Sequence, residues 1–200
     1  MPENSRDRLI HTAANLFARS GFGPVGLDRI IAEVGVTKTT FYNHFESKDA
    51  LIVAVLDHQH NVETASLMAD VQRIGGDDPR DRIVAIFDVF DSWFQESDFR
   101  GCIFMSAANE FPSPNDPIHR AALVHGEHLF RVIRDFAAQA GAADPDALAA
   151  QLMIIISGAI ATRQTAGHLN AAKFAKAAAE ALISAAIAEA PRRRKSTTPA

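Results

Sequence analysis

Residues 35–51, which read GVTKTTFYNHFESKDAL, decide the fold. The chain contains thirteen phenylalanines but only one tyrosine, and that tyrosine, Tyr42, lies in this stretch among short polar side chains and two lysines. A hydrophobic core gains nothing from a phenol hydroxyl, whereas a surface that meets a polar partner can use it in a hydrogen bond. We therefore interpret the stretch as a binding surface.

The stretch also has the form of a helix-turn-helix, in which two short helices, expected at residues 27–34 and 38–44, are joined by a tight turn. Gly35 tolerates the positive φ that such a turn requires, and the Thr37 hydroxyl can cap the second helix. The first residues of that helix would reach the base edges in the DNA major groove. The candidate DNA-binding residues are Thr37, Lys38, Thr39, Thr40, Tyr42, Asn43, His44 and Lys48.

Composition and charge are compatible with this interpretation. The chain has 200 residues, of which 48% are hydrophobic and 22% are charged, as in an ordinary globular protein. Its single cysteine excludes an intrachain disulfide, and the longest apolar stretch, 147–162, is too short and interrupted to span a membrane. We expect a cytoplasmic protein without a membrane partner. Residues 1–50 carry six basic and six acidic residues, whereas residues 51–191 carry ten and eighteen, so the N-terminal part repels a polyanion least.

The rest of the chain is also predicted to be helical, because apolar residues recur at helical spacing and no convincing alternation indicates a strand. The remaining helices are expected at 5–20, 48–74, from 79 onward, in a short apolar segment ending at 111, and at 117–140, 145–167 and 171–190. We predict an all-α fold of about nine helices. It comprises a three-helix DNA-binding domain at 1–50, a ligand-binding and dimerisation domain at 51–190 and a disordered basic tail at 191–200.

Residues 8–55 resemble the TetR family of bacterial transcription regulators. The matching positions are Gly21-Phe22, Ile30, Gly35-Val36-Thr37, Thr40-Phe41-Tyr42, His44-Phe45, Ser47-Lys48 and Leu51. The resemblance implies a homodimer that reads a palindromic operator in double-stranded DNA. It also implies a C-terminal domain that binds a small effector and dimerises through its last two helices. The expected function is thus a transcriptional repressor that an apolar or aromatic effector releases from DNA.

Four positions depart from the family pattern. Gly26 stands where a Ser or Thr usually caps the second helix. Leu27 and Asp28 stand where basic or polar DNA contacts are common, and Ile31 replaces the usual alanine. Asp28 would repel phosphate, although its carboxylate could accept a hydrogen bond from cytosine. We therefore assign sequence specificity to the helix at 38–44.

Large apolar side chains gather in the C-terminal part of the chain, in numbers that an ordinary core could also explain. The aromatic excess favours a cavity for a flat or apolar ligand, and polar groups such as Glu110 could orient it. The candidate ligand-binding residues are Phe90, Trp93, Phe94, Met105, Asn109, His125, His128, Phe130 and Met153.

The segment 145–167 is apolar on nearly every side, so one face can line the core while the other needs a partner. The segment 171–190 is rich in alanine, which lets helices approach closely. Together they suit a four-helix dimer interface. Its candidate residues are Leu152, Ile155, Ile156, Ala159, Ala178, Ala181, Leu182 and Ala185.

Other functions find less support in the sequence. The pairs His125/His128 and His58/His60 could hold a metal, but no further ligands cluster near them in the sequence, and we predict neither a metal site nor a cofactor. Some TetR-type regulators sense electrophiles through a cysteine in this region, so Cys102 offers an alternative; a constitutive DNA-binding protein is another. An enzyme is not expected, because the chain has neither inward Glu-x-x-His pairs nor a phosphate-binding loop.

Overall fold

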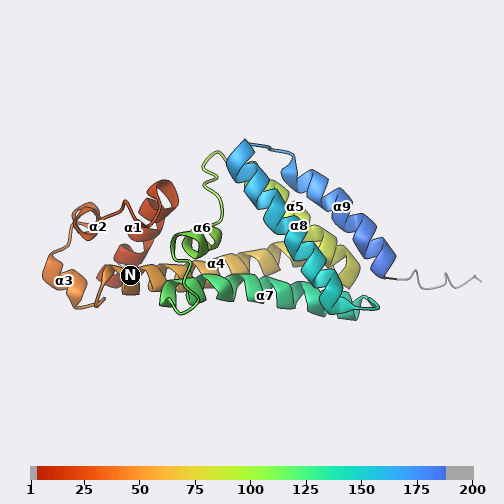
Figure 1. Ribbon diagram of the computed structural model, residues 1–200, viewed down its shortest axis with the longest axis horizontal. Helices are drawn as coiled ribbons and strands as arrows, with labels where there is room; N and C mark the ends of the chain where they lie inside the picture. The colour runs from red at the N-terminus through yellow and green to blue at the C-terminus, as the bar shows by residue number, and fades with distance from the viewer. Residues whose placement is uncertain (1–3, 188–200) are drawn as a thin grey trace, which may run out of the picture.

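Figure 1 shows the described part of the chain folded into helices that are joined by short loops. The computed structural model describes residues 4–187, and this range contains nine helices and no strand, which confirms the all-α prediction. The helices are α1 (Ser5–Ser20), α2 (Leu27–Val34), α3 (Lys38–Tyr42), α4 (Lys48–Gly75), α5 (Pro79–Phe94), α6 (Ile103–Glu110), α7 (Pro117–Gln139), α8 (Pro145–Ala166) and α9 (Ala171–Ala186). The expected end of the last helix and the basic tail lie outside the described residues.

Local capping explains most of these boundaries. The side chains of Thr37 and Ser47 accept hydrogen bonds from the backbone N–H groups three residues later, at the starts of α3 and α4. Gly26, in contrast, gives α2 no side-chain cap. Gly35 ends α2 with φ of 72°, the left-handed conformation that glycine adopts without steric cost.

The third helix is shorter than predicted. α3 ends at Tyr42 rather than at residue 44, because the backbone N–H of His44 bonds back to the Phe41 carbonyl three residues earlier, at 2.9 Å. That tight last turn directs the chain toward Ser47, where α4 begins.

Two hydrophobic cores stabilise the fold, and they do not follow the order of the chain. The first joins α1–α3 and the first turns of α4 to α6 and the start of α7, through buried residues that include Phe104, Ala107, Ile118 and Ala122. The second joins α5, the later part of α7, α8 and α9. The domain boundary at residue 50 stays a prediction. The first hydrophobic core contains residues from both sides of that boundary.

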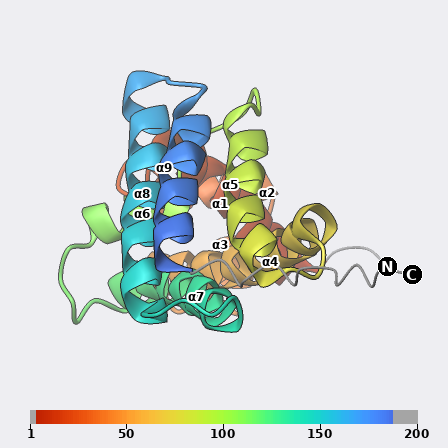
Figure 2. The same ribbon diagram turned by 90° about the vertical axis from the view of Figure 1, so that its right-hand side faces the viewer.

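The long helix α4 connects the two cores. In Figure 1 it runs beside α7 from the N-terminal helices to α5. Figure 2 shows α9 lying between α8 and α5. The buried residues of α4 are Leu51, Ile52, Val55, Leu56 and Val71, so its middle contributes no fully buried apolar side chain.

The helix α8 is long and apolar enough to cross a membrane by length and composition alone. Core helices of soluble proteins pass the same test, and α8 buries Leu148, Leu152, Ile156 and Ile160 against the second core. Packing accounts for one apolar face of α8, while Ile154 on the same helix is 72% exposed.

Candidate nucleic-acid interface and effector region

The unit α1–α3, which we call the reading head, presents a polar surface on an aromatic base. Phe41 and Phe45 are buried beneath α3, while Tyr42 is 56% exposed and meets the Phe41 ring edge-on at 5.3 Å between centroids. Thr37, Lys38, Thr39, Asn43 and His44 are exposed, and Thr40 is half-buried. Seven of the eight candidate DNA-binding residues thus lie on or beside one short, protruding helix.

Two of these threonines also hold the turn together. Thr37 Oγ1 accepts a hydrogen bond from the Thr40 backbone N–H at 3.0 Å and lies 2.9 Å from Thr40 Oγ1. Their hydroxyls fix the start of α3, and the remaining lone pairs and one hydroxyl proton stay available to a partner.

Lys38 is paired with the carboxylate that seemed unfavourable for DNA binding. Lys38 Nζ lies 2.8 Å from Asp28 Oδ1, and this hydrogen bond raises the pKa of Lys38. Both side chains are exposed, so the pair links α2 to α3 at the surface and contributes little to stability. Asp28 thereby holds the Lys38 amine beside the predicted DNA-facing helix.

Lys48 is placed differently from the other candidates. It is half-buried, and its Nζ donates a hydrogen bond of 2.6 Å to the Phe22 carbonyl in the loop between α1 and α2. An ammonium group has three donors, so two remain for a phosphate. The sequence pattern missed this internal role because the two residues are far apart along the chain.

Sequence reasoning also missed Arg6. Its guanidinium carbon lies 5.4 Å from the centre of the Phe45 ring, a cation–π contact at the surface of the reading head. No local motif connects these residues. We add Arg6 to the candidate phosphate contacts.

In the C-terminal part, the predicted ligand residues fall into three places. The first is the histidine cluster, which consists of His60 from α4 with His125 and His128 from α7. The Nδ1 atoms of His60 and His125 are 3.4 Å apart, and His125 stacks on Phe104 with ring centroids 4.0 Å apart. His128 Nε2 is buried without a hydrogen-bond partner.

Two histidines of the cluster, His125 and His128, are held in their neutral form. Burial, with smaller effects from His60 and His128, lowers the pKa of His125 to about 4, and burial also lowers the pKa of His128. Burial raises the pKa of Glu63, whose Oε2 lies 3.9 Å from His125 Nε2. His125 and His128 therefore offer neutral ring nitrogens, which suit an uncharged ligand better than an anion.

The second place is an aromatic cluster of Phe90, Trp93, Phe94 and Phe99. Trp93 lies 4.8 Å from Phe99 and 5.6 Å from Phe94 between centroids, and Phe94 is fully buried. The Arg163 guanidinium covers the Phe99 ring at 4.4 Å and donates to the Phe94 carbonyl at 2.9 Å. These rings fill space with one another, so Phe94 does not line an open cavity.

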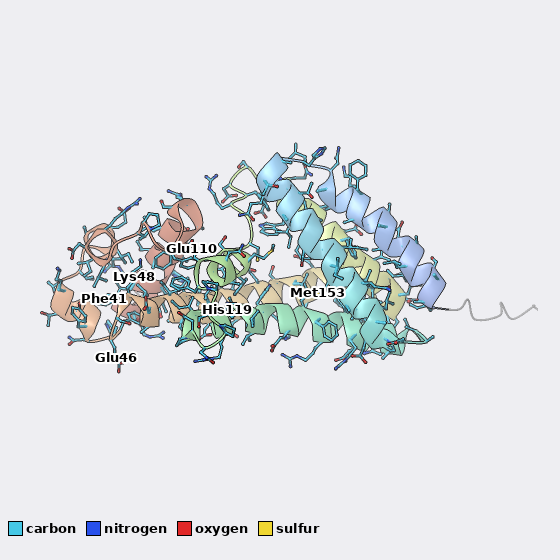
Figure 3. All side chains as sticks on the ribbon, in the orientation of Figure 1. Phe41, Glu46, Lys48, Glu110, His119 and Met153 are labelled. Atoms are coloured by element: carbon cyan, nitrogen blue, oxygen red, sulfur yellow. The ribbon has the colours of Figure 1, made fainter. Side chains whose placement is uncertain are left out.

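The third place is a hollow of about 450 Å³ that is open to solvent between α7 and α8. Phe130 and Met153 line it together with Gly126, Glu127 and Arg131. Figure 3 shows Met153 on α8. Met105 is half-buried and packs against the second core.

Two polar candidates lie at the end of α6, away from the hollow at Phe130 and Met153. Asn109 is exposed, and Glu110, which the sequence suggested as a ligand-orienting group, bonds instead to the backbone of the reading head. That end of α6 meets the loop after α1, where Glu110 lines a smaller hollow of about 180 Å³ together with Gly21 and Ser106.

Cys102 is half-buried, in surroundings that disfavour its thiolate. Burial raises the pKa of Cys102 to about 11, so almost none of it is thiolate at neutral pH. The alternative in which Cys102 senses electrophiles stays a prediction. Within residues 4–187, no group of three or more His, Cys, Asp or Glu side chains is arranged to hold a metal ion.

The predicted dimer surface needs one correction. Leu152 and Ile156 are buried in the second core of the same chain, so they offer no area to a partner. Ile155, Ala159 and Leu182 are half-buried, while Ala178, Ala181 and Ala185 are exposed. Large apolar side chains exposed on α8, on α9 and between them are Ile154 (72%), Phe174 (68%) and Leu169 (50%).

Known proteins are similar to this chain in both halves. The family described as "Bacterial regulatory proteins, tetR family" matches residues 9–55, and "Tetracyclin repressor-like, C-terminal domain" matches residues 79–179. Among curated proteins, the HTH-type transcriptional repressor NemR of Escherichia coli K12 is 28% identical over 54% of this chain and 54% of its own length. YerO of Bacillus subtilis, an uncharacterised HTH-type transcriptional regulator, is 24% identical over 68% of this chain and 52% of its own length. The chain thus spans about half the length of these curated relatives.

Solved structures extend the similarity over nearly the whole chain. A TetR-type regulator (sav143) from Streptomyces avermitilis is 31% identical over 92% of this chain and 98% of its own, with a TM-score of 0.82. SCO4454, a TetR-family regulator from Streptomyces coelicolor, is 30% identical over 92% of this chain and 96% of its own, also with a TM-score of 0.82. With a helix-turn-helix at its N-terminus and a helical repressor-type C-terminal domain, the chain belongs to the TetR family of bacterial transcriptional regulators.

Proposed function

We propose that this regulator is a homodimeric repressor that reads a palindromic operator through α3 and leaves it when an uncharged apolar or aromatic effector binds the C-terminal domain. The observation that carries the proposal is the exposed polar face of α3, fixed on buried Phe41 and Phe45 and continued into α4. A short rigid helix that protrudes is suited to enter a major groove, where its side chains meet base edges. The regulator would act in the cytoplasm, where its DNA is.

The effector half of the proposal is supported by the hollow at Phe130 and Met153 and by the neutral imidazoles of His125 and His128. An apolar ligand in the hollow would gain burial of its surface, and a neutral imidazole could accept or donate one orienting hydrogen bond. Both places lie on α7, which packs along α4. A ligand that binds one arrangement of these helices more tightly raises the population of that arrangement, and with it changes the position of the reading heads.

The dimer is supported by the exposed apolar side chains of α8 and α9. Ile154 and Phe174 stay largely in water in the single chain, at 72% and 68% exposure. A second copy of the same surface would bury them in an isologous interface. Exposed alanines such as Ala178 and Ala181 would let the paired helices approach closely.

Selection from a library of random DNA duplexes tests the DNA-binding half. We expect enrichment of an inverted repeat with half-site centres about 34–36 Å apart or a multiple of this, and affinity that falls steeply with salt. Asn43→Ala should lower affinity and change base preference, whereas the matched control Asn61→Ala, on the exposed surface of α4, should behave as wild type. Failure to enrich any inverted repeat would refute specific operator binding by a dimer.

The effector half is tested by a library of aromatic and lipophilic compounds, read by thermal shift and by release of the selected duplex. We expect compounds that stabilise the free protein to lower its affinity for DNA. Met153→Trp, which fills the hollow, should weaken compound binding and leave DNA binding unchanged. Compounds that bind without changing DNA affinity would refute the regulatory role.

A further inference from the structure

The backbone of the reading head is bonded directly to α6. The Glu110 carboxylate at the end of α6 accepts hydrogen bonds from the Phe22 N–H, at 3.1 Å to both oxygens, and from the Gly23 N–H at 2.9 Å. Figure 3 shows Glu110 at the end of α6 that faces α1. Within the described residues these two amides have no other acceptor. We call this contact the Glu110 clasp.

The loop that the clasp holds is built for close approach. A Cβ atom at Gly21, whose φ is +77°, would lie only 3.0 Å from Glu110 Oε1, so a glycine there lets the carboxylate reach the amides. Lys48 holds the same peptide from the other side by donating to the Phe22 carbonyl. The Phe22 ring is fully buried and meets Phe111, the residue after α6, edge-on at 6.0 Å.

The other side of the clasp belongs to the proposed effector region. Phe104 of α6 stacks on His125 of α7, and His119 Nδ1 of α7 donates to the Phe111 carbonyl at 2.7 Å. A displacement of α7 or α6 therefore pulls on the loop of the reading head through a charged hydrogen bond, which is stronger than a neutral one.

We propose that Glu110 is a positioning residue, through which α6 fixes the orientation of the reading head relative to the C-terminal domain. In a dimer, that orientation sets the separation of the two recognition helices. The inference about half-site spacing rests on the proposed dimeric operator binding, whereas the clasp can be tested on the protein alone.

The first experiment measures hydrogen exchange of the Phe22 and Gly23 amides by NMR in full-length wild type, Glu110→Ala and the neighbouring control Asn109→Ala. Loss of a charge-assisted hydrogen bond should accelerate exchange of these amides by about 10- to 100-fold. Exchange in the middle of α1 should not change in Glu110→Ala, and Asn109→Ala should match wild type. Equal acceleration throughout the reading head would mean that Glu110 only stabilises the fold, and unchanged exchange would mean that no clasp exists; either result overturns the proposal.

The second experiment compares binding to duplexes selected on the wild type, with the spacer between half-sites lengthened or shortened by one or two base pairs. Wild type should lose affinity steeply with each change, because the two heads are held at one separation. Glu110→Ala should bind the original duplex several-fold more weakly and discriminate less among spacers, and Glu110→Gln should fall between. A variant that weakens binding equally at every spacing contradicts the positioning role. If selection on the wild type yields no inverted repeat, the proposed operator binding is refuted. The hydrogen-exchange experiment still tests the Glu110 clasp in that case, because it uses the protein without DNA.

Discussion

Acidification should destabilise this protein through His125, and the size of the effect follows from its surroundings. The imidazole is packed on Phe104 beside His60 and His128, and its pKa falls from an ordinary 6.5 to about 4. The unfolded chain therefore binds a proton more readily than the folded one. The free energy of unfolding falls as the pH drops below about 6.5, and the loss is complete below about pH 4.

The shift corresponds to about 3 kcal/mol in total, of which about 2 kcal/mol is lost between about pH 7.5 and pH 5. Urea denaturation at fixed protein concentration, followed by Trp93 fluorescence, measures this loss. His125→Phe keeps a ring that can stack on Phe104 and removes the titrating group, so its stability should depend on pH less than that of wild type by about that amount. His168→Asn removes an exposed histidine from the loop between α8 and α9 and should retain the wild-type dependence. Equal pH dependence of His125→Phe and wild type would refute the reasoning.

Three other substitutions or reactions test the interface, the dimer and the thiol. Tyr42→Phe should weaken binding to the selected duplex by about 1–3 kcal/mol, since a hydrogen bond to a charged phosphate is lost; fluorescence anisotropy that detects no change would remove the hydroxyl from the interface. Ile154→Asp should convert the dimer to the 21.6 kDa chain in light scattering, because a charge would be buried against the partner, and a variant that stays dimeric would place the interface elsewhere. Cys102 should resist alkylation near neutral pH, since its pKa is about 11, and complete labelling within minutes by iodoacetamide would contradict its burial.

The helices were predictable because their boundaries depend on neighbouring residues. Thr37 caps the helix that follows it, as the sequence indicated, and α4 and α5 begin at the predicted residues because Ser47 caps α4 and Pro79 opens α5. The predicted end of α3 was wrong by two residues, because the turn at His44 depends on where α4 must begin.

The side-chain partners were less predictable, because they join distant parts of the chain. Glu110 and Lys48 were expected to face a ligand and a phosphate, yet both bond to the peptide of Phe22. Helix α8 is apolar almost all round, so periodicity could not show that Leu152 faces the core while Ile154 faces outward. The polar face of α3 was predictable, since buried Phe41 and exposed Tyr42 are adjacent in a recognisable motif.

The interleaved cores have a consequence for synthesis on the ribosome. The core beneath the reading head includes Phe104, Ala107, Ile118 and Ala122, so it stays incomplete until more than half of the chain has left the exit tunnel. A nascent chain that ends after α4 lacks those side chains and the carboxylate that binds the loop after α1. Translation therefore completes the core beneath the reading head late, together with the start of α7, the helix that carries His125 and His128. A fragment restricted to the family's N-terminal module would leave apolar surface of α1 and α4 in water.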